Sequence, residues 1–198
     1  MQSLRELYKV GRGPSSSHTM GPERAVKWAK ENFPTADSFK ITLYGSLALT
    51  GQGHGTDRII TETLEPIKCE IVFDKNAPCS VHPNTMDIEA FESNKSIGKR
   101  RIYSVGGGTI VFDNESSPIH SEAKDVYDLN SYSEISDFCA KHNIRIWQYV
   151  EMCEGKEIWD YLLKIWEKMK ESIRQGLITT GILPGGLGTQ RRAQILFN

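Results

Sequence analysis

The sequence predicts an α+β fold: a mixed or antiparallel sheet with packed helices, followed by a long C-terminal amphipathic helix. Segments in which apolar and polar residues alternate, a pattern typical of half-buried strands, are concentrated between residues 38 and 113. Segments with apolar residues at helical spacing lie before, between and after these strands. The last of the helical segments, residues 155–177, is also the longest.

Prolines, glycines and capping residues divide the chain into these elements. Pro22 suits the first turn of a helix that Pro34 ends. Gly51–Gly55 predicts a glycine-rich turn, and Thr56 or Asp57 is the expected cap of the next helix. The predicted helices cover residues 4–8, 22–33, 56–66, 133–142 and 155–177, and the predicted strands cover residues 38–46, 68–74, 86–92, 99–105 and 109–113.

The composition changes in the last quarter of the chain, and we expect a division near residue 145. Residues 1–145 are predicted to form one α+β domain, and residues 146–198 a linker helix and the start of a further domain. The linker helix has one apolar face that needs a partner, formed by Ile158, Leu162, Ile165, Met169, Ile173 and Leu177. The glycine-rich ending "ILPGGLGTQRRAQILFN" predicts that this helix leads into a domain that the sequence does not contain.

Charge and hydropathy argue against several functions. The chain has 198 residues with 24 basic and 25 acidic side chains, a net charge of −1, so we expect no nucleic-acid or membrane-surface binding. No run approaches 18 apolar residues, so no membrane span is expected. The N-terminus is polar and mixed in charge, which is not typical of a secretory signal. A cytoplasmic location is therefore predicted.

The four cysteines do not form a recognisable metal-binding pattern. Cys69, Cys79, Cys139 and Cys153 include no C-x-x-C pair, and their spacing matches neither a zinc ribbon nor a ferredoxin. We predict that they are reduced thiols and that this chain holds no metal.

The stretch "GRGPSSSHTMGPERA" concentrates hydroxyl groups and an imidazole between two Gly-Pro pairs. Ser15, Ser16, Ser17 and Thr19 could cap the following helix, but capping requires only one hydroxyl. The alternative is an anion-binding site, in which the hydroxyls and the helix-start amides hold a carboxylate while His18 transfers a proton. Residue types alone leave both interpretations open.

Three further polar or glycine-rich segments have simple structural explanations. His54 lies between two glycines in "GQGHGTD", where an exposed loop histidine is the plainer interpretation and a ligand-contacting one the alternative. His82 and Asn84 in "HPNTM", like the three glycines in "SVGGGT", are typical of turns.

Taken in order, five motifs resemble the iron-sulfur-dependent bacterial L-serine dehydratases, also called L-serine ammonia-lyases. They are "SLRELYKVGRGPSSSHTMGP", "LYGSLALTGQGHGTD", "HPNTM", "IYSVGGG" and "LPGGLGTQRRA", and they run through almost the whole chain. The resemblance covers the β domain of that family and the linker into its α domain. It also implies a fold similar to the substrate-binding regulatory domain of some phosphoglycerate dehydrogenases.

The resemblance implies a lyase reaction in which L-serine yields pyruvate and ammonia, a step of amino-acid catabolism and gluconeogenesis. A [4Fe-4S] cluster on an α domain, in the same chain or a separate subunit, would accept the substrate hydroxyl as a Lewis acid. His18 and His54 would then be catalytic proton-handling residues, with the choice of base left open. The substrate-binding residues would be Ser15, Ser16, Ser17, Thr19, His82 and Asn84.

This interpretation also predicts what the chain does by itself. Without the cysteine-rich half we expect no bound cluster and no activity, and the abrupt ending suggests a fragment of a single-chain enzyme. A homo-oligomer is expected. The alternative function is a non-catalytic regulatory module that binds serine or another small carboxylate.

Overall fold

The computed structural model describes residues 1–113, 125–183 and 188–197, which form two compact units. Within the described residues, the sheet unit comprises residues 11–113, 181–183 and 188–191. The helical unit comprises residues 1–10, 125–180 and 192–197. No helix in the described part of the chain is both long enough and apolar enough to cross a membrane. Residues 184–187 of the "LPGGLGTQRRA" motif lie outside the described residues.

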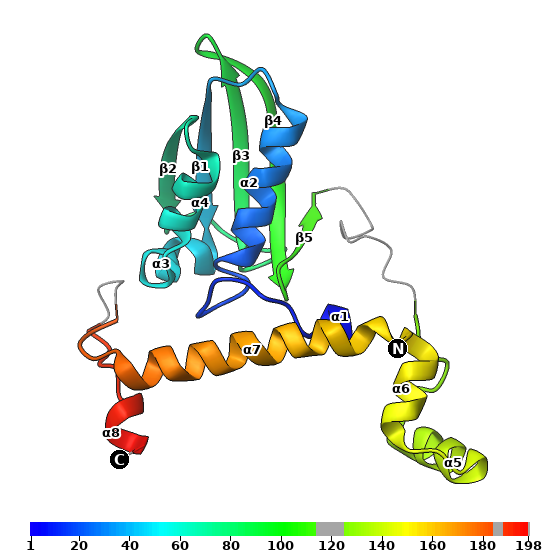
Figure 1. Ribbon diagram of the computed structural model, residues 1–198. Coiled ribbons are helices and arrows are strands. Elements are labelled where there is room, and N and C mark those ends of the chain that lie inside the picture. Colours follow the sequence, from blue (N-terminus) through cyan, green and yellow to red (C-terminus); the bar gives the residue numbers. More distant parts are fainter. Residues whose placement is uncertain (114–124, 184–187, 198) are drawn as a thin grey trace. The chain divides into compact units, whose positions relative to one another are not determined.

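The sheet unit is built on a mixed five-stranded sheet with the strand order β2-β1-β3-β4-β5 (Figure 1). Its strands are β1 (Ser38–Tyr44), β2 (Lys68–Asp74), β3 (Thr85–Glu92), β4 (Lys95–Gly106) and β5 (Thr109–Phe112). β1 and β2 are parallel, and the other neighbours are antiparallel. The α+β class and the five predicted strands are therefore confirmed.

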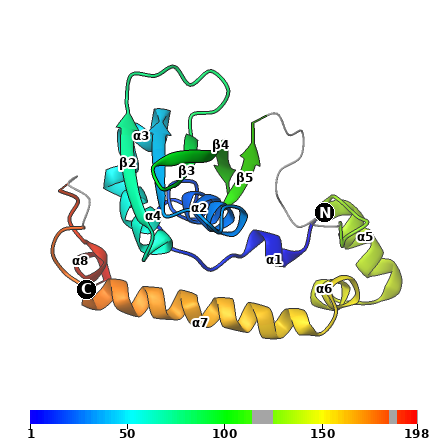
Figure 2. The ribbon, with the colours of Figure 1, turned by 90° about the horizontal axis from the view of Figure 1, so that it is seen from above.

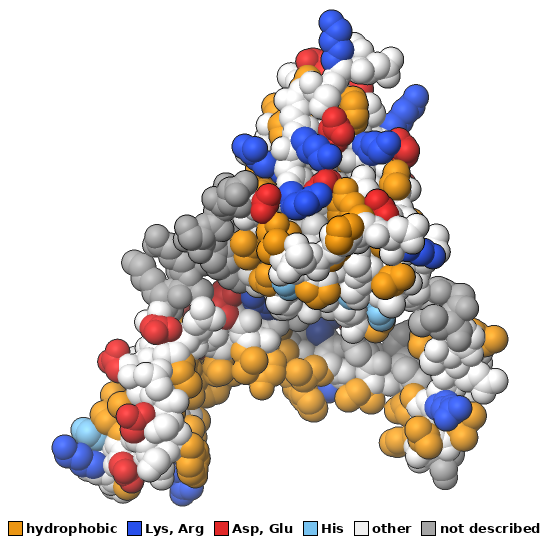
Figure 3. Space-filling view, turned by 180° about the vertical axis from the view of Figure 1, so that it is seen from behind, with side chains coloured by type: hydrophobic (Ala, Val, Ile, Leu, Met, Phe, Trp, Pro, Cys, Tyr) orange, Lys and Arg blue, Asp and Glu red, His pale blue; other side chains and the backbone are white. Residues whose placement is uncertain are grey.

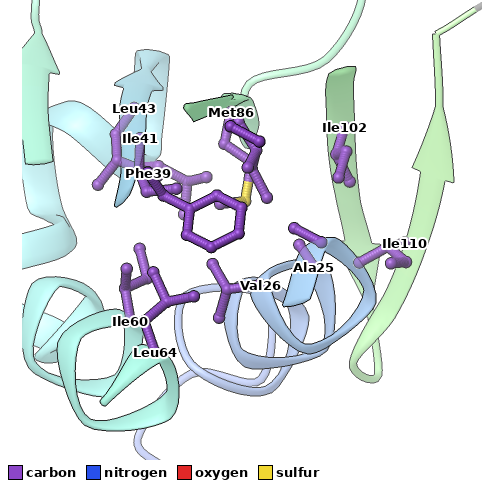
Figure 4. Close-up of a cluster of buried hydrophobic side chains, with 14 of the residues drawn as sticks. Ala25, Val26, Phe39, Ile41, Leu43, Ile60, Leu64, Met86, Ile102 and Ile110 are labelled. Carbon is purple, nitrogen blue, oxygen red and sulfur yellow. The ribbon is translucent and has the colours of Figure 1, made fainter. Parts of the chain in front are cut away.

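Three helices cover one face of this sheet: α2 (Met20–Asn32), α3 (Gly45–His54) and α4 (Thr56–Leu64) (Figures 1 and 2). In Figure 4, Phe39 and Met86 of the sheet point toward Val26 of α2 and Ile60 of α4. These four side chains are at most 2% exposed. Because full burial of such a side chain stabilises a protein by about 1.5–3 kcal/mol, this core fixes how the helices lie on the sheet.

The predicted turn at Gly51–Gly55 is wrong, because α3 continues to His54. The helix forms despite its glycines because Leu47, Ala48 and Gly51 are buried. A Cβ atom on Gly51 would meet Thr56 Oγ1 at 3.2 Å, so glycine allows close packing at this position. Only Gly55 turns the chain, with a left-handed φ of 73°, and it rather than Thr56 or Asp57 is the N-cap of α4.

The helical unit contains α1 (Leu4–Leu7), α5 (Tyr132–His142), α6 (Ile146–Glu154), α7 (Glu157–Ile178) and α8 (Ala193–Phe197). The sequence did not indicate α6. The carboxylate at its end, Glu154, accepts hydrogen bonds from Ser3 Oγ and Leu4 N, both at 2.6 Å, and from the Tyr127 hydroxyl at 2.9 Å. It thereby fixes the N-terminal segment within this unit. The domain division near residue 145 stays a prediction.

The 22-residue helix α7 exposes several large apolar side chains. Leu163, Trp166, Met169 and Ile173 are 57%, 51%, 42% and 56% exposed. Figure 3 shows hydrophobic side chains in a continuous band along this helix. A band of this kind is typical of a surface that packs against another protein segment.

Candidate functional site

The polar residues singled out in the sequence meet at one end of the sheet. β1 ends at this end and leads directly into α3, while the antiparallel β3 begins there, with Leu43 opposite Met86. β4 ends there and brings Ser104 against the first turn of α2, where a Cβ atom on Gly21 would lie only 1.9 Å from Ser104 Oγ. The segment before α2 is thus brought close to the beginnings and ends of three strands.

His18 is surrounded by hydroxyl groups on both sides of its ring. Its side chain is buried, with a residue exposure of 7%. Nδ1 lies 3.0 Å from Ser15 Oγ and 3.1 Å from Ser17 Oγ. Nε2 lies 3.2 Å from Ser46 Oγ and 3.0 Å from Thr50 Oγ1. Because a hydroxyl can donate or accept, this set of four can hold either neutral tautomer of the imidazole.

The pKa of His18 lies below the usual value for histidine. Burial of the ring is the largest cause, and the charge of the neighbouring His54 adds to it, while a backbone interaction with Ser46 partly opposes it. His18 is therefore uncharged near neutral pH, the form that can either accept or relay a proton.

This shift predicts that the protein loses stability in mild acid. In the unfolded chain this histidine has a pKa of about 6.5, so as the pH falls it binds a proton at a higher pH than folded His18 does. The free energy of unfolding therefore falls as the pH drops from above 6.5 to the lower pKa of the folded state. The variant His18→Gln removes this titration and should flatten that part of the profile. Denaturant unfolding between pH 8 and pH 5 measures it, and an unchanged slope in the variant would contradict the assignment.

His54 lies beside His18 but has no comparable set of partners. The two ring centroids are 4.6 Å apart, with an angle of 57° between the rings. Nδ1 of His54 is buried without a hydrogen-bond partner. In the described parts of the chain, the hydrogen bonds place no protein group on its other ring nitrogen either. Of the two histidines, His54 is therefore the one whose ring is free to bond to a ligand.

The serine-rich segment contributes unequally to this cluster. Ser15 and Ser17 face the His18 ring, whereas Ser16 uses its carbonyl to accept a hydrogen bond from Gly21 N. Thr19 directs its hydroxyl to the carbonyl oxygen of Ser15 at 2.7 Å, and as the N-cap of α2 it makes no side-chain capping bond. The hydroxyl groups of this segment thus serve His18 and the local backbone, and none of them is recorded as a cap of α2.

His82 and Asn84 lie at the start of β3, at the same end of the sheet. His82 Nδ1 accepts a hydrogen bond from Asn84 N at 3.1 Å, and its ring centroid lies 6.3 Å from that of Tyr103. Asn84 Nδ2 donates to the carbonyl of Ser104 at 3.3 Å, and Asn84 Oδ1 is buried without a partner. His82 therefore shapes the predicted turn, while Asn84 keeps a free hydrogen-bond acceptor.

Three hydroxyl residues that contact His18 were not predicted from the sequence. Ser46 and Thr50 bond to Nε2, and the buried Thr56 hydroxyl donates to the His18 carbonyl at 2.7 Å. The spacing of Ser46, Thr50 and His54 at i, i+4 and i+8 would have placed them on one helical face. That signal was hidden because this segment was predicted to be the end of a strand followed by a turn.

The described residues contain no group of three or more histidine, cysteine or acidic side chains that could hold a metal ion. Cys69 and Cys79 belong to the sheet unit, and Cys139 and Cys153 to the helical unit. These residues therefore do not fit a [4Fe-4S] cluster.

The sheet unit thus combines a mixed five-stranded sheet with a buried, hydroxyl-surrounded imidazole that lies beside a second imidazole. Comparison with known families is more specific: the chain belongs to the serine dehydratase beta chain family, whose model matches residues 3–72 and 59–115. The matched regions include each residue of the histidine cluster.

Individual relatives align along nearly the whole chain. L-serine dehydratase 1 of Escherichia coli K12 is 29% identical, with 99% of this chain and 54% of the relative covered. The L-serine dehydratase of Haemophilus influenzae is 28% identical, with 100% of this chain and 54% of the relative covered. The L-serine dehydratase of Helicobacter pylori J99 is 29% identical, with 96% of this chain and 52% of the relative covered. The chain thus spans about half the length of the curated relatives it matches.

Proposed function

We propose that this chain supplies half of the active site of an L-serine dehydratase, which converts L-serine to pyruvate and ammonia. The observation that carries the proposal is the uncharged, buried His18, held by four hydroxyl groups with the unpaired His54 ring 4.6 Å away. A structural histidine needs one or two hydrogen-bond partners, whereas this arrangement suits a group that must exchange protons.

In the proposed reaction, hydroxyl groups of the segment before α2, which can donate as well as accept hydrogen bonds, bind the substrate carboxylate. His54 removes the proton from the α-carbon, and His18, fixed by its hydroxyl partners, orients the His54 ring and takes part in relaying that proton. The hydroxyl group leaves from the β-carbon, and the resulting aminoacrylate rearranges to an imine that water hydrolyses to pyruvate and ammonia. The resemblance assigns acceptance of the hydroxyl to a [4Fe-4S] cluster, and residues other than those described here would have to hold it.

The rest of the enzyme is proposed to cover the apolar face of α7. The exposed side chains of Leu163, Trp166, Met169 and Ile173 suit packing against an α domain, from the same chain or a separate subunit. By itself, the chain is then expected to be inactive. A cytoplasmic homo-oligomer remains part of this proposal.

A regulatory binding module is the second candidate function. A cavity of about 360 Å³ lies in the sheet unit, and its lining includes Asp74 and Arg101, two side chains of opposite charge. Such a pair suits a small zwitterion such as an amino acid. The expected similarity to a phosphoglycerate dehydrogenase regulatory domain would agree with this function.

The test of the proposed function is complementation. This chain and the C-terminal half of a related L-serine dehydratase are prepared separately, combined under anaerobic conditions with iron and sulfide, and assayed for pyruvate formation from L-serine. We expect neither part to be active alone and the mixture to be active. An equally active C-terminal half without this chain would contradict the proposal.

A further inference from the structure

Thr56, the first residue of α4, connects this helix to the segment before α2. Its side chain is 0% exposed, and its hydroxyl donates a hydrogen bond to the carbonyl oxygen of His18, 38 residues away in the sequence, at 2.7 Å. Threonine hydroxyls in helices commonly bond to the carbonyl four residues earlier in the same helix. Thr61 and Thr63 of α4 do so, at 3.0 and 2.6 Å. Thr56 instead makes a contact between distant segments.

The carbonyl of His18 cannot be paired by α2 in the usual way. In a helix that continued back through His18, the N–H group four residues later would bond to this carbonyl. That position is Pro22, and proline has no N–H group. His18 is only 7% exposed and a buried carbonyl requires a donor. The Thr56 hydroxyl therefore supplies the hydrogen bond that the sequence of α2 does not provide.

This bond also connects the two histidines. Only Gly55, with its left-handed φ of 73°, separates Thr56 from His54. A hydrogen bond from Thr56 to the His18 carbonyl therefore holds the backbone of His18 close to the backbone of His54. The two ring centroids are 4.6 Å apart.

The position of Thr56 is itself restricted. A Cβ atom on Gly51 would lie 3.2 Å from Thr56 Oγ1 and 3.3 Å from Thr56 Cβ, so α3 packs closely against this side chain. From the same helix, Ser46 and Thr50 contact Nε2 of His18 at 3.2 and 3.0 Å. The orientation of the His18 ring is thus fixed through α3, and the position of its backbone through α4.

We propose that Thr56 is a positioning residue that sets the spacing of the His18 and His54 rings and thereby the rate of proton transfer at this site. The effect on the rate rests on the proposed function, whereas the spacing is a property of the chain itself. Thr56 is fully buried and its hydroxyl is used by His18, so it acts through the histidines and not on the substrate. A misplacement of about 1 Å can lower the rate of an enzyme roughly 10²-fold.

The first test measures the ring spacing in the chain by NMR, from the nuclear Overhauser cross-peaks between the ring protons of His18 and His54. Thr56→Ser keeps the hydroxyl and should keep these cross-peaks. Thr56→Val keeps the size of the side chain but has no donor, so the cross-peaks should be lost. The matched control is Thr63→Val, which removes a hydroxyl that bonds within α4 and should leave the cross-peaks unchanged.

The second test measures kcat and KM for L-serine in the assembled enzyme. We expect Thr56→Val to lower kcat about tenfold or more with KM within about twofold of the wild-type value, and Thr56→Ser to keep kcat within about twofold. The rates are measured where circular dichroism shows each variant to be folded, so that a lower melting temperature does not count as a lower kcat. Should Thr56→Val not fold, Thr56→Cys replaces it, because a thiol is only a weak donor and differs from serine by one atom.

Three results would each overturn the inference: a wild-type chain without ring cross-peaks, a Thr56→Val variant with wild-type cross-peaks or kcat, and equal losses of kcat in the serine and valine variants. A wild-type assembly that forms no pyruvate would instead overturn the proposed function. The NMR comparison would still decide whether Thr56 sets the spacing, so the two failures are distinguishable.

Discussion

In the assembled enzyme, His54→Ala should lower kcat for pyruvate formation from L-serine by about a hundredfold or more, because a positioned general base contributes about 10²–10⁴-fold. His54 has no protein hydrogen bond to lose, and its ring contacts His18 at 4.6 Å. The substitution should therefore leave secondary structure and assembly unchanged. The measurement is the steady-state rate over a range of L-serine concentrations, with circular dichroism as the check on folding.

The control for this variant is His142→Ala. The ring of His142 stacks on Phe138 at 4.0 Å in the helical unit and takes no part in the proposed site. Its kcat should remain within about twofold of the wild-type value. A His54→Ala enzyme with the same near-normal kcat would show that His54 takes no part in the chemistry, and the assignment of the base would be wrong.

Arg101→Ala should have the largest effect on stability, lowering the free energy of unfolding by about 2 kcal/mol at neutral pH. Arg101 Nε and Nη2 bind the Asp87 carboxylate at 2.7 and 2.9 Å, and the Tyr44 hydroxyl donates to it at 3.0 Å. The Asp87 side chain is only 5% exposed, so removal of the guanidinium leaves a buried carboxylate poorly compensated. Lys99 Nζ lies 3.4 Å from Asp87 Oδ2 and would remain to compensate part of the carboxylate charge. The expected loss of unfolding free energy is therefore smaller than is usual for a broken buried ion pair.

The stability lost in Arg101→Ala should be largest near neutral pH and should shrink in acid. Burial of Asp87 opposes its ionisation, but hydrogen bonds from Arg101 and Tyr44 and the nearby positive charges outweigh burial and lower its pKa. This contribution to stability is present above the pKa of an unfolded aspartate, about 4, and is lost as the pH falls through the lower folded-state pKa. The free energies of unfolding of the wild type and of Arg101→Ala should therefore converge in acid.

Urea denaturation at pH 7 and at pH 3 measures this difference, with Arg100→Ala as the control. Arg100 is the preceding residue on β4 and is also exposed, but none of the ion pairs recorded between described residues involves it. A loss of stability in Arg101→Ala that is no larger than in Arg100→Ala would show that the Asp87 pair is solvated and contributes little.

The strands could be predicted because their positions follow from alternation alone. Phe39, Ile41 and Leu43 face the helices while the residues between them do not, and this pattern is visible in the sequence. α3 could not be predicted in the same way, because its three glycines indicate a turn. Packing of Leu47 and Ala48 against the sheet overrides that local preference, and a single sequence does not contain this tertiary effect.

The candidate site shows the same limit. Ser15, Ser17 and His18 are close in sequence, so their association was visible before the structure. Ser46 and Thr50 reach the same ring only through α3, and the unpaired oxygen of Ser104 is brought to the site by sheet pairing and the close approach of Gly21. Contacts between distant segments of this kind depend on the fold, and local spacing gives no sign of them.

The most direct test of the central claim, that this histidine cluster takes part in the chemistry, is the separation of kcat and KM for His18→Gln in the assembled enzyme. Glutamine can keep hydrogen bonds to the surrounding hydroxyls but cannot exchange the proton. The proposed half-site predicts that kcat falls about a hundredfold or more with assembly unchanged. Wild-type values of both kcat and KM in this variant would contradict the claim.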